Sequence, residues 1–127
     1  MNQTKGIFTK IDTVIVRVGK LAEAQAWYEQ KLGFRPSYIG EQERLVVFNV
    51  GGETPLTIYE LKPGEMIAPQ RTASSYPIFY ADDIQAAHEL LSARGVEVGP
   101  IEGEPDGTQW FAFKDCDGNQ LEVCHYR

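Results

Sequence analysis

Hydrophobic and polar positions along the chain follow the same order in its two halves: a strand-like alternation, a helix-like stretch, then further alternation. In the first half, Val14, Val16 and Val18 share one face of the first predicted strand, because successive side chains of a strand point to opposite faces. The helical stretch is rich in helix formers and ends before Gly33, a residue typical of the position after a helix. The predicted elements are a strand at 11–18, a helix at 22–32, a polar excursion at 36–43, and strands at 44–50 and 56–61.

The second half repeats this order. Asp83 precedes the helical stretch and is expected to cap it, and Gly95 follows its end. A turn at 115–118 separates two alternating runs and predicts the clearest hairpin of the chain. The predicted elements are a strand at 76–81, a helix at 84–94, a short strand beginning at 96–98, and strands at 110–113 and 120–126.

The two halves correspond to each other with an offset of 62 or 63 residues. Thr13 corresponds to Tyr76 (76 − 13 = 63) and Glu60 to Glu122 (122 − 60 = 62). Duplicated units usually bury the surface that they share. We therefore expect one α+β domain, with one helix per half on the outer face of its sheet and these four residues near the seam.

Composition limits the classes of function. The chain has 127 residues, enough for one ordinary domain, and its formal net charge of −6 argues against a nucleic-acid or anionic-membrane partner. No apolar run approaches the roughly 20 residues that span a bilayer. The N-terminus lacks the apolar core of a signal peptide, which predicts a cytoplasmic protein in which Cys116 and Cys124 are reduced and unpaired.

Side chains on the faces turned away from the helices are expected to line a cup between the halves. The parity of Glu60 is ambiguous, because both faces of its strand are apolar, and its inward placement depends on the repeat. An aromatic set that includes Trp110 would suit a flat or amphipathic ligand. The expected ligand-binding residues are Thr13, Arg17, Glu60, Tyr76, Tyr80, Trp110 and Tyr126, with Glu122 as the catalytic candidate.

Four segments carry a resemblance to a known family. The segments 11–21, 27–34, 81–84 and 113–123, which include Leu-Gly-Phe after the first helix and Asp-Cys-Asp-Gly-Asn-Gln-Leu-Glu near the end, resemble the vicinal oxygen chelate superfamily. This group contains glyoxalase I, bleomycin-resistance proteins and extradiol dioxygenases. The resemblance implies two βαβββ modules, at about 7–62 and 76–127 with a linker at 63–75, that form an incomplete barrel within a single domain 1–127. It also implies a homodimer, since cups in this family are completed by a paired module or a partner chain.

In metal-dependent members, the first strand of each module supplies a His or Gln and the last supplies a Glu. Glu122 matches such a position strongly and Glu60 moderately, whereas Thr13 and Tyr76 do not match. Imidazole ligands suited to zinc, nickel or iron are therefore missing. We expect no cofactor and no metal site of the family type; if a divalent metal does bind, Glu60 and Glu122 would be its ligands.

Three functions follow as hypotheses. The first is a protein that binds or transforms a small organic molecule in the cup without a metal, with Arg17 pairing with an acid or an anionic ligand. The second is a metal-dependent lyase, isomerase or dioxygenase with Glu122 as ligand or base. The third is a non-catalytic dimeric interaction protein. The missing histidines favour the first over the second, and the sequence leaves open whether the protein is an enzyme.

Overall fold

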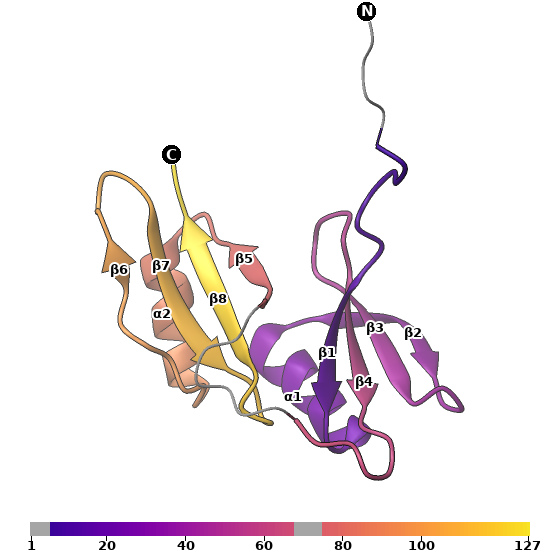
Figure 1. The fold of residues 1–127 in the computed structure, drawn as a ribbon. Helices are drawn as coiled ribbons and strands as arrows, with labels where there is room; N and C mark the ends of the chain where they lie inside the picture. Colours follow the sequence, from indigo (N-terminus) through magenta and orange to yellow (C-terminus); the bar gives the residue numbers. More distant parts are fainter. Residues whose placement is uncertain (1–5, 68–74) are drawn as a thin grey trace, which may run out of the picture.

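The computed structural model describes residues 6–67 and 75–127 and shows two modules with the same order of elements (Figure 1). The first contains β1 (Val14–Val18), α1 (Leu21–Leu32), β2 (Arg35–Gly40), β3 (Leu45–Asn49) and β4 (Leu56–Glu60). The second contains β5 (Ile78–Tyr80), α2 (Ile84–Ala93), β6 (Glu102–Gly103), β7 (Gln109–Lys114) and β8 (Gln120–His125). This confirms the α+β fold of two βαβββ modules. Of the predicted linker, residues 68–74 lie outside the described residues.

Each module forms a four-stranded sheet, in the orders β1-β4-β3-β2 and β5-β8-β7-β6. The first strand of each module runs parallel to the last, because the helix carries the chain back across the sheet. The remaining pairs are antiparallel. The two sheets do not close into a barrel and leave an open, cup-like face.

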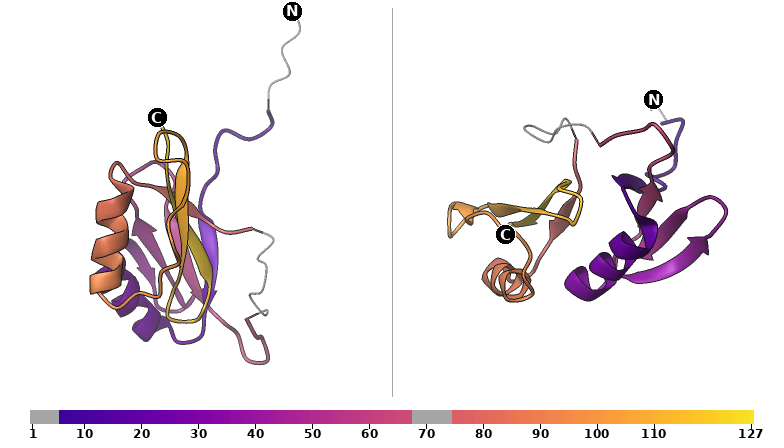
Figure 2. Two further views of the ribbon diagram at one scale, coloured as in Figure 1. Left: turned by 90° about the vertical axis from the view of Figure 1, so that its left-hand side faces the viewer. Right: turned by 90° about the horizontal axis from the view of Figure 1, so that it is seen from below.

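Both helices lie on the same side of the sheets, as the view from below shows (Figure 2). The buried core lies between the helices and the sheets, and it is continuous across the modules, with the rings of Phe34 and Phe79 5.6 Å apart. Alternation along the strands decides which residues enter it. The largest fully buried side chains are Tyr28, Phe48, Phe111, Leu56, Ile58, Leu121, Val18 and Val46.

The turn between β7 and β8 joins the second module to the first. The buried carboxylate of Asp115 accepts hydrogen bonds from the Tyr28 hydroxyl of α1 at 2.6 Å and from the backbone amides of Asp117 and Asn119 at 2.9 Å. The side-chain amide of Asn119 donates to the carbonyl of Arg17 in β1 at 2.9 Å. The Asp-Cys-Asp-Gly-Asn motif therefore links the modules as well as forming a hairpin turn.

Two local predictions differ from the structure, and one is confirmed. Most of strand β2 lies in the predicted polar excursion at 36–43. It is an exposed edge strand with a register shift between Pro36 and Tyr38, and edges tolerate proline because one side of the strand needs no ladder hydrogen bonds. The short strand expected from 96–98 is only an isolated bridge between Val98 and Phe113. The side chain of Asp83 caps α2, as predicted.

Candidate functional site

The parallel strand pairs define which residues of the two modules are equivalent. Ile15 of β1 lies opposite Thr57 of β4, and Ile78 of β5 lies opposite Glu122 of β8. The first strands are therefore offset by 63 residues (78 − 15) and the last strands by 65 (122 − 57). Thr57 is consequently the counterpart of Glu122.

Thr13 and Thr57 form a hydrogen-bonded pair at the seam of the first module. Their hydroxyl oxygens are 2.7 Å apart, and the Thr13 hydroxyl also contacts the Pro55 carbonyl at 3.2 Å. Thr57 is buried, and each hydroxyl has a partner within the protein. At these two seam positions the first module therefore has only neutral hydroxyl groups.

Tyr76 and Glu122 occupy the equivalent corner of the second module. Repulsion from the Glu122 carboxylate, together with a hydrogen bond to it, raises the pKa of Tyr76 above its ordinary value. The side-chain amide of Gln120 donates to Glu122 at 3.2 Å. Glu122 is half-buried and is the acidic group of this corner, where it could accept a hydrogen bond or a proton from a bound molecule.

Glu60 does not face the cup, and its predicted inward placement is wrong. Leu56 and Ile58 are buried against the helix side, and Glu60 shares their face of β4. Its carboxylate accepts the Leu21 amide at the start of α1 at 2.9 Å and the Arg44 guanidinium at 2.8 and 2.9 Å. These hydrogen bonds, from Arg44 first, lower the pKa of Glu60 to about 2. With the 65-residue offset, Glu60 corresponds to His125 (60 + 65) rather than to Glu122.

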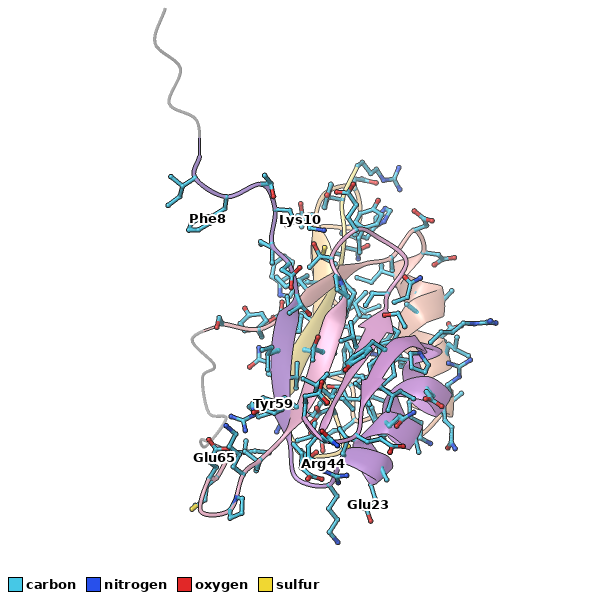
Figure 3. All side chains as sticks on the ribbon, turned by 90° about the vertical axis from the view of Figure 1, so that its right-hand side faces the viewer. Phe8, Lys10, Glu23, Arg44, Tyr59 and Glu65 are labelled. Atoms are coloured by element: carbon cyan, nitrogen blue, oxygen red, sulfur yellow. The ribbon has the colours of Figure 1, made fainter. Side chains whose placement is uncertain are left out.

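Arg17 lies on the cup face and is held by several groups. Its guanidinium donates to the carbonyls of Tyr59 and Glu60 at 3.2 and 3.1 Å and lies 4.4 Å from the centre of the Tyr59 ring. It also forms an ion pair with Glu65 at 2.5 Å. Tyr59 and Glu65 are on the side of the sheets away from the helices (Figure 3).

A cavity of about 670 Å³ lies beside β1 and meets the seam at Tyr76, whereas Thr13, Thr57 and Glu122 do not line it. Arg17 and Tyr76 are the two predicted ligand-binding residues that line it. Its walls combine an apolar part with a few polar groups, as is usual for small-molecule sites. The lining residues are Val14, Ile15, Val16, Arg17, Leu61, Glu65, Met66, Ile67, Ser75, Tyr76, Pro77, Asn119 and Gln120.

The other predicted aromatics lie on the open face of the second sheet, outside this cavity. The Tyr80 hydroxyl donates to the Tyr126 carbonyl at 3.0 Å, and the two rings meet edge to face with centres 5.0 Å apart. Trp110 lies opposite Cys124 in the β7–β8 ladder, on the face opposite the buried Phe111. All three aromatics keep at least a third of their surface exposed.

A sequence-family model matches residues 10–123 and describes the Glyoxalase/Bleomycin resistance protein/Dioxygenase superfamily. The chain belongs to this superfamily. The family match and the two-module fold together confirm the resemblance that the sequence segments indicated.

Several solved structures share the fold at low identity. A glyoxalase family protein from Bacillus anthracis is 22% identical with a TM-score of 0.79, covering 98% of this chain and 100% of that one. TnmS3, an antibiotic binding protein from Streptomyces sp. CB03234, is 22% identical with a TM-score of 0.75, covering 97% and 100%. The fosfomycin resistance protein FosX from Listeria monocytogenes is 15% identical with a TM-score of 0.74, covering 95% and 96%. Among curated proteins, none matches the sequence significantly.

The donor set of this superfamily member does not fit a divalent metal of the family type. Thr13, Thr57, Tyr76 and Glu122 occupy the four seam positions, which provide one carboxylate and no imidazole. Across residues 6–67 and 75–127, no three His, Cys, Asp or Glu side chains gather as a metal site would require.

The two histidines lie away from the seam pairs. His88 of α2 contacts the Gly99 carbonyl at 2.8 Å, and His125 of β8 contacts the Ala81 carbonyl at 2.8 Å. Burial and the neighbouring carboxylates of Asp115 and Asp117 raise the pKa of Cys116 to about 12, so its thiol is a poor nucleophile. None of these groups supplies a missing ligand.

Sequence reasoning missed Thr57 and Glu65, and it did not count Gln120 among the ligand-binding residues. Thr57 stands between two apolar residues of a strand, and a polar residue inside an apolar run was the available signal. Gln120 shares the cup-facing parity of Glu122, which also indicated its place. Glu65 lies in a turn where periodicity carries no information, and only the structure places it at Arg17.

Within the described part of the chain, no helix is both long and apolar enough to cross a membrane.

Proposed function

We propose that the protein binds a small organic molecule in its cup, without the divalent metal that metal-dependent superfamily members use. The observation that supports this proposal is the composition of the seam, where Thr13–Thr57 and Tyr76–Glu122 are two hydrogen-bonded pairs. A metal ion at the seam would have to break these hydrogen bonds, and it would find a single carboxylate as its ligand there. A small organic ligand needs only apolar walls and a few polar anchors.

Two structural relatives support the same class of ligand. TnmS3 is an antibiotic binding protein and FosX a fosfomycin resistance protein. By analogy, we propose sequestration or conversion of a toxic organic compound. In a conversion, Glu122 is the group placed to take a proton, because its carboxylate lies beside the neutral hydroxyl of Tyr76.

The proposal is tested by a thermal-shift screen of drug-like and metabolite-like molecules. A compound that stabilises the wild type should give no shift with Tyr76→Ala, since Tyr76 lines the cavity. Leu90→Ala is the matched control. Leu90 lines a second cleft, called here the helix-side cleft, which shares Val14 and Pro77 with the cup cavity but does not include Tyr76, so its ligand shift should remain. Loss of the shift in the control, with the shift retained in Tyr76→Ala, would place the ligand in the other cleft and contradict the proposal.

We also propose that the protein forms a homodimer in which the open faces of the sheets are covered. Ile15, Ile78 and Tyr80 are about half exposed on the cup face, where a partner chain could cover them. Light scattering should give about twice the 14.3 kDa mass of one chain. A mass of one chain at micromolar concentration would contradict this arrangement.

A further inference from the structure

We propose that the cup takes an amphipathic organic anion, and that the anionic group of the ligand replaces the Glu65 carboxylate on Arg17. This inference rests on the proposed function and adds the chemical class of the ligand and a built-in competitor. In the structure, Glu65 occupies the position that the carboxylate of the ligand would take.

The cradle around the Glu65 carboxylate has two donors. Oε1 accepts a hydrogen bond from Arg17 Nη2 at 2.5 Å and from the backbone amide of Lys62 at 2.7 Å. A guanidinium combined with a backbone N–H is a typical site for a carboxylate or phosphonate oxygen. The chain thus shows directly that this position accepts an organic anion.

Arg17 is positioned independently of Glu65. The carbonyls of Tyr59 and Glu60 accept its Nε and Nη2 protons, and its guanidinium rests on the Tyr59 ring. Because these partners belong to strand β4, the guanidinium stays in place when Glu65 leaves. The site therefore needs little rearrangement before an external anion binds.

Glu65 itself is held only weakly. Its side chain is 41% exposed, and it follows β4 in a turn in which its amide donates to the Lys62 carbonyl at 2.9 Å. Ion pairs between exposed side chains contribute little because solvent and salt screen them. An external carboxylate can take over both donors without uncovering buried groups.

The adjoining cavity indicates what the rest of the ligand resembles. Leu61, Met66 and Ile67 form an apolar wall beside Glu65, and Tyr76 and Gln120 supply hydrogen-bonding groups across the seam. An anion with an apolar body would fit both the Arg17 site and the apolar wall. Arg17 and Lys62 both lie over the Tyr59 ring. Because the chain as a whole carries a net charge of −6, we expect the protein to repel polyanions and to favour a ligand with a single anionic group.

The test uses three probes of similar shape: benzoate and phenylphosphonate as anions, and benzamide as the neutral analogue. Affinities are measured by NMR titration of the wild type, Glu65→Gln, Arg17→Gln and the charge-matched control Glu53→Gln. Glu53 lines the helix-side cleft and lies outside the cup cavity. Glu65→Gln should bind both anions about two- to fivefold more tightly, the range of an exposed ion pair, with benzamide unchanged. Arg17→Gln should lose about tenfold or more for the anions.

Equal or weaker anion binding by Glu65→Gln would overturn the inference, as would unchanged anion binding by Arg17→Gln. An equal gain in Glu53→Gln would also overturn it, because the effect would then come from net charge. If molecules from the screen perturb the Tyr76 resonance while the Arg17→Gln change leaves the affinity for these anions unaltered, only this inference fails. If no organic molecule perturbs Tyr76, the proposed function fails with it.

Discussion

Glu60 stabilises the fold from a distance in sequence. The residue before α1 is Lys20, whose side chain makes no capping hydrogen bond, so the first amides of the helix need an acceptor from elsewhere. The Glu60 carboxylate supplies it at Leu21 and accepts hydrogen bonds in turn from Nε and Nη2 of the Arg44 guanidinium. A negative charge at this end also interacts favourably with the helix dipole. Glu60 is thus a tertiary cap that joins β4 to α1.

The change Glu60→Gln should lower the free energy of unfolding by about 1 kcal/mol at neutral pH, the usual effect of losing a helix cap. The pKa of Glu60 is lowered from 4.5 to about 2 in the folded protein, so its contribution is present above about pH 4.5 and is lost as the pH falls toward 2. Urea unfolding at pH 7 and pH 2.5 measures the free energy of unfolding of both proteins. The difference between wild type and variant should be smaller at pH 2.5. The exposed control Glu89→Gln should have the same free energy of unfolding as the wild type at both pH values. A difference between wild type and Glu60→Gln that is equal at pH 7 and pH 2.5 would contradict the account.

At the scale of elements, the β7–β8 turn determines how the modules meet. Asp115 accepts hydrogen bonds from its own turn and from Tyr28 of α1, and burial together with this carboxylate raises the pKa of Tyr28, which keeps the hydroxyl a neutral donor. Asp117 accepts the Gly19 amide at 3.2 Å, and Asn119 donates to the carbonyl of Arg17. One short turn therefore fixes both the start of α1 and the end of β1.

The change Asp115→Ala should destabilise the protein by about 2 to 4 kcal/mol, because it leaves the buried Tyr28 hydroxyl and turn amides without an acceptor. Tyr28→Phe removes one of these bonds and should cost less. Asp106→Ala, in an exposed loop, is the control and should stay within about 0.5 kcal/mol of the wild type. Chemical denaturation measures all three, and an Asp115→Ala value equal to the control would show that the turn does not hold the modules together.

Periodicity and turn residues were sufficient for most elements of the fold. The helices and the 115–118 hairpin carry strong local signals, and Asp83 marks its helix correctly. Periodicity did not indicate strand β2, because an exposed edge strand with a proline shows no alternation; only the family resemblance implied a third strand after the first helix. Residue spacing alone also could not place Glu60, since the offset between the halves grows from 63 to 65 along the module. Only strand register shows that Thr57 takes the seam position.

On the scale of the whole molecule, the duplication produces a cup whose two corners have different chemistry. The first module contributes a neutral pair, Thr13 and Thr57, and the second contributes Tyr76 with Glu122. Arg17 adds the positive charge between them on the cavity wall. This asymmetry suits the orientation of an amphipathic ligand more than the symmetric coordination of a metal ion.

The central claim, that the cup functions without a divalent metal, is tested most directly by elemental analysis. The protein is purified without chelator, incubated with zinc, nickel, manganese and iron, and separated from free ions. The donor set predicts far less than one equivalent of any of these metals per chain, in both the wild type and Glu122→Gln. One equivalent in the wild type that is lost in Glu122→Gln would contradict the account.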